Sequence, residues 1–544
     1  MLNRRAFVRT GSLGAAALLL HRDRLWAQTP AGSPGAIVDT TAGKVRGLLI
    51  DRVQAFKGVP YGASTTGARR FLPPVKATPW TGVRETFAWG HRCPQAVAPF
   101  VPEWQPLTGT EPMGEDCLHL NVWTPDASRR SKRPVMAWLH GGGYTGGSPA
   151  AVPYEGAQLA RKHDVVVVSI THRLNVFGFV HLADIGGEKF ADASNAGMKD
   201  IVAGLEWIRD NIAAFGGDPG TVTIFGQSGG AGKVSTLLGM PAAQGLFHRA
   251  IAQSGSAVTS MPATTASQNA EALMSRLELK PNQADALQQL PIEQVIAAMQ
   301  PAGGRGGRGG TGGGGFQTSP VVDGRSLPHD VFNPAATALS ATIPLLIGST
   351  ETEVTWGVNT DYAAPADEAA LRERVKRALR TDDAHAASVV SIYRKGRPKA
   401  NLLDLALIVE TDASQFRTGV DLEAERKAAQ GAAPVYMYRF QWYSPVSGGR
   451  LRAMHCMDIP FAFDNVDSSQ SIVGNGSDRQ ALSDRMSHAW VAFARSGNPG
   501  HAGLPRWDPF DATKRATMMF NTECRAVNDP FRDERLAITD TRPR

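Results

Sequence analysis

The sequence predicts an α/β fold in which a mainly parallel sheet is covered by helices on both faces. Three observations lead to this expectation. Short apolar runs recur along the chain, amphipathic segments separate them, and a glycine-flanked serine follows one run directly. The 544 residues, of which 42% are hydrophobic, are enough to bury a large core.

Four apolar runs are predicted to form buried strands of this sheet, at residues 134–139, 165–170, 222–225 and 343–347. They are apolar on both faces, as expected where helices cover both sides of a parallel sheet. Between the second and third runs, Ile201, Leu205, Ile208 and Ile212 keep one helical face apolar. Strands that alternate with such helices favour a single α/β unit.

Two segments depart from this alternation. Residues 303–315 are almost all glycine, and such a segment cannot bury enough apolar surface to offset its ordering entropy, so we expect a flexible surface loop. Residues 360–430 are predicted to be a mainly helical insertion, a common place for a substrate-binding cap. We therefore expect one catalytic domain over residues 28–544.

Residues 1–27 have the pattern of an export signal, with a basic start, a short apolar stretch and a small-residue cleavage site. The pair Arg4-Arg5 followed by Phe7 resembles the twin-arginine signal, which would make the twin-arginine export machinery a partner. An ordinary secretory signal is the alternative. The apolar stretch is too short for a stable membrane anchor, so both readings predict an exported protein, periplasmic or secreted.

The net charge of +7 does not indicate a nucleic-acid partner. Residues 1–27 hold five arginines and a single aspartate, so more than half of the net charge lies in this segment. The rest of the chain has no run of Lys or Arg that could follow a phosphate backbone.

The four cysteines are too few for a disulfide scaffold. Cys93 and Cys117 could close a modest loop in an oxidising compartment, and whether they are bonded stays open. For Cys456 and Cys524 we expect buried free thiols.

Ser228 is the candidate nucleophile. It lies in Gly226-Gln227-Ser228-Gly229-Gly230, directly after the strand at 222–225 and before a helix-compatible run. A serine on a tight strand-to-helix turn is exposed at the edge of the sheet, and flanking glycines avoid clashes in the strained backbone. A structural glycine turn is the alternative interpretation.

A second glycine motif, His140-Gly141-Gly142-Gly143, follows the strand at 134–139. Bare backbone N–H groups at Gly142 and Gly143, together with that of Gly229, would form an oxyanion hole. A phosphate-binding loop is disfavoured because no Lys-Ser/Thr follows the glycines.

Several further motifs, in order, make the chain resemble the type-B carboxylesterase family, which includes para-nitrobenzyl esterases and cholinesterases. The resemblance runs from about residue 35 to the C-terminus and is carried by residues 115–123, 211–219, 253–256 and 493–499, besides the two glycine motifs. It implies the α/β-hydrolase fold. Relatives more often have alanine at the position of Gly229, but glycine supplies the same N–H.

The resemblance also implies the other catalytic residues, and both follow Ser228 as the chain order of α/β-hydrolases requires. The acid is placed at Glu353, with Glu351 as the alternative because Val354 replaces the family's usual glycine. The base is placed at His455, before an acidic residue and an Ile-Pro-Phe run. Ser254 is placed behind the triad as a supporting hydrogen-bond partner.

Together these residues predict a serine hydrolase that cleaves carboxylic esters through an acyl-enzyme, without metal or organic cofactor. The partner is a small-molecule ester, whose acyl and alcohol groups the sequence does not specify. An amidase, lactonase or transesterase with the same triad is an alternative. A non-catalytic binding protein of the same fold is a second alternative.

Overall fold

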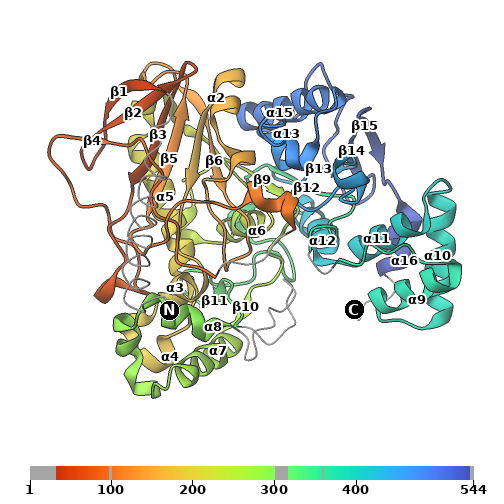
Figure 1. Ribbon diagram of the computed structural model, residues 1–544, viewed down its shortest axis with the longest axis horizontal. Coiled ribbons are helices and arrows are strands. Elements are labelled where there is room, and N and C mark those ends of the chain that lie inside the picture. Colours follow the sequence, from red (N-terminus) through yellow and green to blue (C-terminus); the bar gives the residue numbers. More distant parts are fainter. Residues whose placement is uncertain (1–31, 97–100, 301–315, 358–359, 540–544) are drawn as a thin grey trace, which may run out of the picture.

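A sheet of 13 strands runs through the part of the chain that the computed structural model describes, residues 32–96, 101–300, 316–357 and 360–539 (Figure 1). The order is β1-β2-β3-β5-β7-β6-β8-β9-β12-β13-β14-β15, with β4 beside β2. In this order the strands from β7 to β14 are parallel to their neighbours. The pairs outside this stretch are antiparallel, except that β4 pairs with β2 in parallel. The export signal at 1–27 and the glycine-rich segment at 303–315 lie outside the described residues.

The strands of this sheet are β1 (Ser33–Asp39), β2 (Lys44–Ile50), β3 (Val53–Pro60), β4 (Val83–Glu85), β5 (His119–Thr124), β6 (Arg133–Leu139), β7 (Val166–Ile170), β8 (Gly217–Gln227), β9 (Arg249–Gln253), β12 (Leu345–Thr350), β13 (Val435–Phe440), β14 (Ala516–Phe520) and β15 (Arg525–Asn528). A separate parallel pair joins β10 (Met261–Pro262) and β11 (Val321–Val322). The predicted fold class is confirmed. Strand β12 begins two residues later than expected, after Pro344, which has no N–H for the ladder.

The helices are α2 (Ala157–His163), α3 (Asn175–Gly178), α4 (Ala183–Gly186), α5 (Ala196–Asn211), α6 (Gly229–Leu237), α7 (Ala263–Arg276), α8 (Ile292–Met299), α9 (Glu368–Leu379), α10 (Asp383–Gly396), α11 (Leu402–Asp412), α12 (Gln415–Ala428), α13 (Ile459–Ala462), α14 (Gln470–Val473), α15 (Asp478–Ser496) and α16 (Arg532–Thr539). Among the described residues, none of them is long and apolar enough to cross a bilayer.

Both faces of the central sheet are buried, because successive residues of a strand point to opposite sides. In β6, Val135, Ala137 and Leu139 pack into one hydrophobic cluster with α5 and α6. Met136 and Trp138 pack into a second cluster with α13 and α15. The continuous apolar runs of the sequence thus reflect strands with two covered faces.

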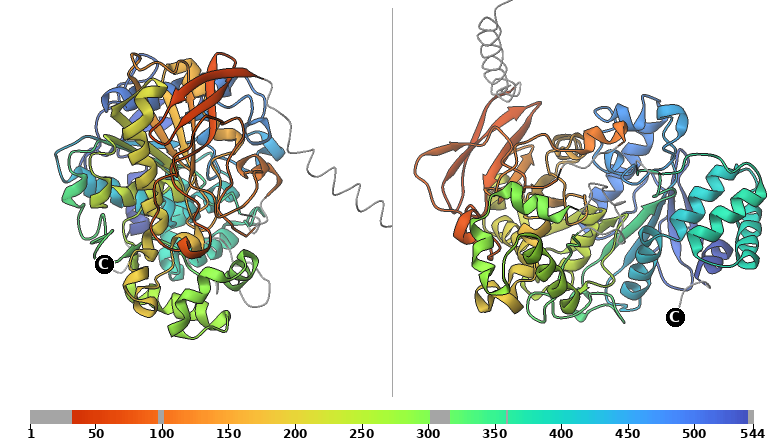
Figure 2. Two further views of the ribbon diagram at one scale, coloured as in Figure 1. Left: turned by 90° about the vertical axis from the view of Figure 1, so that its left-hand side faces the viewer. Right: turned by 60° about the horizontal axis from the view of Figure 1, so that its bottom comes forward.

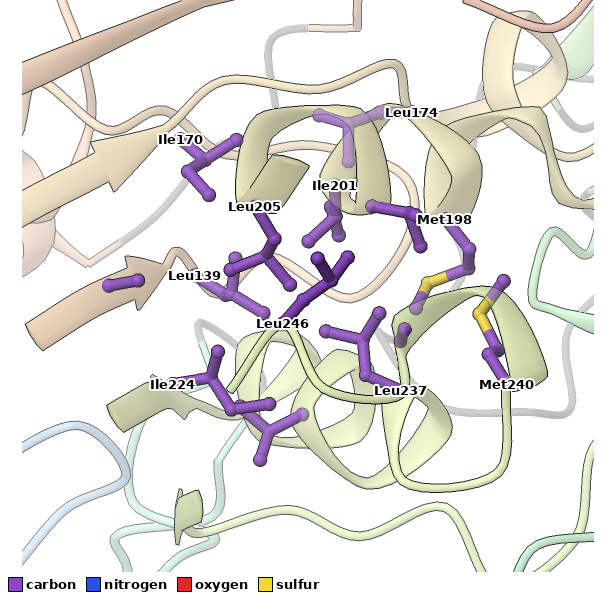
Figure 3. Packing of buried hydrophobic residues seen from close by; sticks show 14 of the residues in the cluster. Leu139, Ile170, Leu174, Met198, Ile201, Leu205, Ile224, Leu237, Met240 and Leu246 are labelled. Carbon is purple, nitrogen blue, oxygen red and sulfur yellow. The ribbon is translucent and has the colours of Figure 1, made fainter. Parts of the chain in front are cut away.

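Helix α5 packs against one face of the sheet, at the carboxyl ends of β6 and β8. Figure 3 shows its residues Ile201 and Leu205 close to Leu139 at the end of β6, with Ile224 of β8 and Leu237 of α6 in the same cluster. This packing fixes the ends of β6 and β8 relative to α6, and the two glycine motifs lie at those ends.

Helices α9, α10, α11 and α16 form a group at one end of the molecule, beyond β14 and β15 (Figures 1 and 2). They share a hydrophobic cluster of their own. Helix α12, which follows α11, packs instead on β12 and β13. The segment 360–430 therefore contributes both to a separate helical group and to the cover of the sheet.

Candidate active site

Ser228 lies in the sharp turn between β8 and α6, at the carboxyl end of a central strand. Its backbone has φ 58° and ψ −125°, a conformation that is unfavourable for a non-glycine residue. The strained turn is held by hydrogen bonds from Ser228 N–H to the Gln253 carbonyl (2.8 Å) and from Gly232 N–H to the Ser228 carbonyl (3.0 Å). The side chain is partly exposed while its neighbours in β8 are buried, so the hydroxyl is presented to a reactant.

His455 and Glu353 form a buried pair. The imidazole Nδ1 lies 2.6 Å from Glu353 Oε2. A carboxylate can only accept, so Nδ1 carries the proton and Nε2 keeps its lone pair. The other oxygen, Glu353 Oε1, accepts the N–H of Thr350 at 2.6 Å, which fixes the carboxylate.

Glu351, the alternative acid, points to a different partner. Its Oε1 accepts from Arg397 Nη1 (2.6 Å) and from Gln441 Nε2 (2.7 Å). In the structure His455 therefore contacts Glu353, whereas Glu351 binds Arg397, which directly follows α10 of the helical group.

The amide of Gln227 faces His455, with Nε2 3.3 Å from the imidazole Nε2. No hydrogen bond joins Ser228 Oγ to His455 in the described residues. In unliganded enzymes such catalytic hydrogen bonds are commonly long and tighten when substrate binds. Gln227 was not singled out from the sequence, although its position before Ser228 places it at the end of β8.

The loop Gly141–Gly143 lies beside the nucleophile, since a Cβ placed on Gly141 would be 3.4 Å from Ser228 Cβ. Gly142 and Gly143 have φ 93° and 62°, which favour glycine. Among the described residues the N–H groups of Gly142 and Gly143 have no acceptor. Gly229 is the first residue of α6, where the N–H has no partner within the helix.

Beneath this loop, Lys233 of α6 reaches two carbonyl oxygens, those of His140 (3.1 Å) and Gly143 (2.9 Å). The His140 ring stacks on His172 with centroids 4.6 Å apart. Lys233 was not predicted from the sequence, because a lysine in a helix gives no sign that it is buried.

Three aromatic side chains surround His455. Phe416 of α12 is closest, with ring centroids 4.4 Å apart. Trp356 and Trp104 lie at 5.8 and 6.4 Å and stack on one another at 5.4 Å. They come from three separate segments, so only the fold reveals the group. It provides an apolar wall around the base.

The supporting hydrogen bond expected from Ser254 is not seen among the described residues, where its buried hydroxyl has no partner. Ser254 instead ties β9 to β12 through its N–H, which donates to the Gly348 carbonyl at 2.8 Å.

The sequence leaves open whether Cys93 and Cys117 are bonded. Cys93 and Cys117 are free thiols, and both are buried. Cys93 Sγ accepts the N–H of Leu174 at 3.2 Å, and its contact with Cys117 raises the pKa of the Cys117 thiol. The loop that a disulfide would have closed is therefore held by packing and hydrogen bonds.

Asp458, the acidic residue after His455, is a buried carboxyl that the sequence did not assign to the site. Its Oδ2 accepts from Tyr438 (2.6 Å) and Gln253 (3.1 Å). Burial raises its pKa to about 6, although these hydrogen bonds act in the opposite direction. Asp458 thus belongs to a polar network around the strand ends next to His455.

This fold and arrangement define a serine hydrolase of the α/β-hydrolase fold. The sequence profile of the carboxylesterase family matches residues 34–539, and the chain belongs to that family.

Individual proteins that are similar to this chain support the same family assignment. The chain is 33% identical over 511 residues to the para-nitrobenzyl esterase of Bacillus subtilis (strain 168), covering 92% of this chain and 98% of that protein. It is 35% identical over 512 residues to the phenmedipham hydrolase of Pseudarthrobacter oxydans, with the same coverage. A Geobacillus stearothermophilus carboxylesterase crystal structure at pH 6.2 superimposes with a TM-score of 0.76 at 36% identity, covering 92% of this chain and 99% of that one. The protein is therefore a carboxylesterase of the serine hydrolase type.

Proposed function

We propose that the protein hydrolyses carboxylic esters through an acyl-enzyme on Ser228, with His455 as base and Glu353 as acid. The observation that carries this proposal is the buried His455–Glu353 pair, with Nδ1 2.6 Å from Oε2, at the same strand ends as the strained Ser228 turn. The pair directs Nε2 away from Glu353, and this nitrogen, which lies 3.3 Å from Gln227 Nε2, takes the serine proton as Oγ attacks the ester carbonyl.

The carbonyl oxygen becomes negatively charged when Oγ bonds to the carbon. The N–H groups of Gly142, Gly143 and Gly229 are the donors for this oxyanion. Glu353 stabilises the imidazolium that forms. His455 then gives its proton to the alkoxide leaving group, and the alcohol departs. Water attacks the acyl-enzyme by the same route and releases the acid and Ser228.

Hydrolysis of short-chain p-nitrophenyl esters by the mature protein tests this function. We expect Ser228→Ala to lower kcat by at least about 10³-fold, as removal of a nucleophile does in other serine hydrolases. Ser254→Ala is a matched control, since it deletes a buried serine hydroxyl that has no hydrogen-bond partner in the described part of the chain. Its turnover should stay close to that of the wild type.

The alternatives are outcomes of the same assay. Faster turnover of a matched p-nitroanilide or lactone, or acyl transfer to an added alcohol, would favour an amidase, lactonase or transesterase. A folded wild type that is inert on all acyl lengths, and whose Ser228 is not labelled by a fluorophosphonate, would contradict the proposal and favour a binding protein.

We further propose that residues 1–27 direct export, with the pair Arg4-Arg5 as the twin-arginine element. Fusion of this segment to a folded reporter tests it. The reporter should leave the bacterial cytoplasm, and replacement of both arginines by lysine should retain it. Export of the lysine variant would indicate an ordinary secretory signal instead.

A further inference from the structure

Lys233 is a buried cation that the proposed mechanism does not use. It lies on α6, five residues after Ser228, and its side chain is fully buried. Its Nζ donates to the carbonyl oxygens of His140 and Gly143, at the two ends of the glycine loop. It also lies 5.5 Å from the ring centroid of Tyr144, the residue after the loop.

No carboxylate lies within salt-bridge distance of Lys233 in the part of the chain that the structure describes. Burial alone lowers the pKa of Lys233 to about 7. The neighbouring imidazoles are kept neutral, because burial and then the charge of Lys233 lower the pKa of both His140 and His172. The Lys233 side chain is thus surrounded by neutral groups, and its N–H groups donate to backbone carbonyls. This arrangement is costly for stability alone.

The two carbonyls belong to the peptide units on either side of the candidate oxyanion donors. A peptide unit is planar, so a bond that fixes its carbonyl also fixes its orientation. The Gly142 and Gly143 amides lie between these two fixed units, on a loop of positive-φ glycines that has little stiffness of its own.

The glycines at the start of α6 allow the glycine loop to approach the helix closely. A Cβ on Gly229 would fall well inside contact distance of the Gly143 carbonyl, and a Cβ on Gly230 would do the same at the Leu139 carbonyl. Glycines at the start of α6 therefore let the loop lie directly on the helix, and Lys233 holds it there.

We propose that Lys233 is a positioning residue of the oxyanion hole, which through its two hydrogen bonds to the loop carbonyls holds the Gly142 and Gly143 amides toward the reacting carbonyl. This inference rests on the proposed esterase function. The negative charge on the carbonyl oxygen appears only in the transition state and is stabilised by preorganised amide donors in a water-poor site. The effect of Lys233 should therefore fall on kcat and little on KM.

Lys233→Met tests the inference, because methionine keeps an unbranched side chain and removes the donors and the charge. We expect kcat on a p-nitrophenyl ester to fall by about 10- to 100-fold, less than for loss of a direct oxyanion donor, with KM within about threefold. The affinity for phenylboronic acid, which forms a tetrahedral anion on an active serine, should fall in parallel with kcat/KM. Lys233→Gln keeps amide donors and should recover part of kcat.

Lys427→Met is the matched control. Lys427 of α12 is also buried, donates to one backbone carbonyl (Ala341, 3.1 Å), and has a pKa that burial lowers to about 8. Its replacement should leave kcat unchanged. A Lys233→Met enzyme with native circular dichroism, full fluorophosphonate labelling of Ser228 and wild-type kcat would overturn the inference.

A loss of kcat in Lys233→Met with no loss of boronate affinity would also overturn it, since a poorly positioned hole must weaken both. A wild type that neither turns over esters nor is labelled at Ser228 would instead contradict the proposed function itself. The two failures are therefore distinguishable.

Discussion

Two glutamates that are two residues apart have different partners. Glu353 is bound on one oxygen by the Thr350 N–H and on the other by His455. Glu351 faces Arg397 and Gln441. Because the two carboxylates belong to separate polar networks, their contributions to catalysis and stability can be separated by substitution.

Glu353→Gln should lower kcat by about 10³-fold or more, because a neutral amide no longer orients the imidazole or stabilises the imidazolium. Steady-state kinetics on a p-nitrophenyl ester, at equal concentrations of folded protein, give the comparison. Glu351→Gln is the matched variant and should keep kcat within about threefold, with a lower free energy of unfolding from its weakened ion pair. Equal losses of kcat in the two variants would contradict the assignment of the acid.

Glu423 of α12 is a second buried carboxyl with a measurable consequence. Its oxygens are bonded to Ser235 Oγ (2.8 Å) and Ala257 N–H (3.3 Å), next to α6. Burial raises its pKa from 4.5 to about 8, against the smaller effect of these hydrogen bonds. Between these pH values the folded protein keeps a proton that the unfolded chain releases, so stability must fall as pH rises through this window.

Glu423→Gln removes this titration and keeps both contacts, with its NH₂ donating to Ser235 Oγ and its oxygen accepting from Ala257. The Tm of the variant relative to the wild type should therefore increase from pH 5 to pH 8, by about 3 °C or more. Differential scanning calorimetry measures it. The exposed Glu523→Gln should show no such trend. A pH-independent difference for Glu423→Gln would mean that Glu423 is already ionised in the folded protein at pH 5.

At the scale of elements, the glycine loop and α6 act as one unit. Gly229→Ala would place a Cβ against the Gly143 carbonyl, so the loop must move away from the helix. Because relatives more often have alanine at this position, we expect the loop to adjust and kcat to fall by no more than about tenfold, with little change in KM. Steady-state kinetics give both values.

Gly220→Ala is a control on the same strand-to-helix segment, since its Cβ would meet only Asp218 Oδ1 at 3.3 Å. Its kcat should match that of the wild type. Full activity of Gly229→Ala would show that the loop can shift without loss of the hole.

The elements that the sequence predicted best are those that depend on local pattern. The runs at 134–139, 165–170 and 222–225 coincide with β6, β7 and part of β8, because a strand covered on both faces is apolar at every position. The helix through Ile201 and Leu205 is α5 for a similar reason. Local apolar pattern is therefore sufficient to locate the strand ends that position the site.

Features that depend on contacts between distant segments were not predictable in this way. The aromatic wall around His455 combines Trp104, Trp356 and Phe416, which are far apart in the sequence. The burial of Lys233, and the lack of a partner for the Ser254 hydroxyl among the residues that the structure describes, likewise follow from three-dimensional packing. A resemblance to relatives identifies motif positions, but it does not show what a side chain contacts.

At the scale of the whole molecule, Arg397 joins the helical group to the hydrolase sheet. Its guanidinium contacts Glu351, after β12, at 2.6 Å and Glu534 of α16 at 3.0 Å. All three side chains are at least nine-tenths buried, and burial raises the pKa of Glu534 to about 7. The helical group thus depends on a buried charge cluster in addition to its own apolar core.

Arg397→Met should lower the free energy of unfolding by about 3–5 kcal/mol, because it leaves two buried carboxylates without their cation. Equilibrium denaturation in urea measures this loss. Arg506→Met breaks an ion pair with Asp508 whose side chains are 87% and 48% exposed, and it should cost about 1 kcal/mol or less. Similar losses in the two variants would mean that solvent reaches the Arg397 cluster.

The four buried free thiols provide internal probes of local opening. Burial raises the pKa of Cys456 and Cys524, and the hydrogen bond with Cys93 together with burial raises that of Cys117. Since the thiolate is the species that alkylating reagents attack, the closed protein should react slowly at all of these positions. Cys456 adjoins His455, Cys524 precedes β15, and Cys93 contacts the chain before α3. Pulsed alkylation followed by peptide mass spectrometry can therefore time the opening of three regions in the unmodified chain, without the introduction of a label.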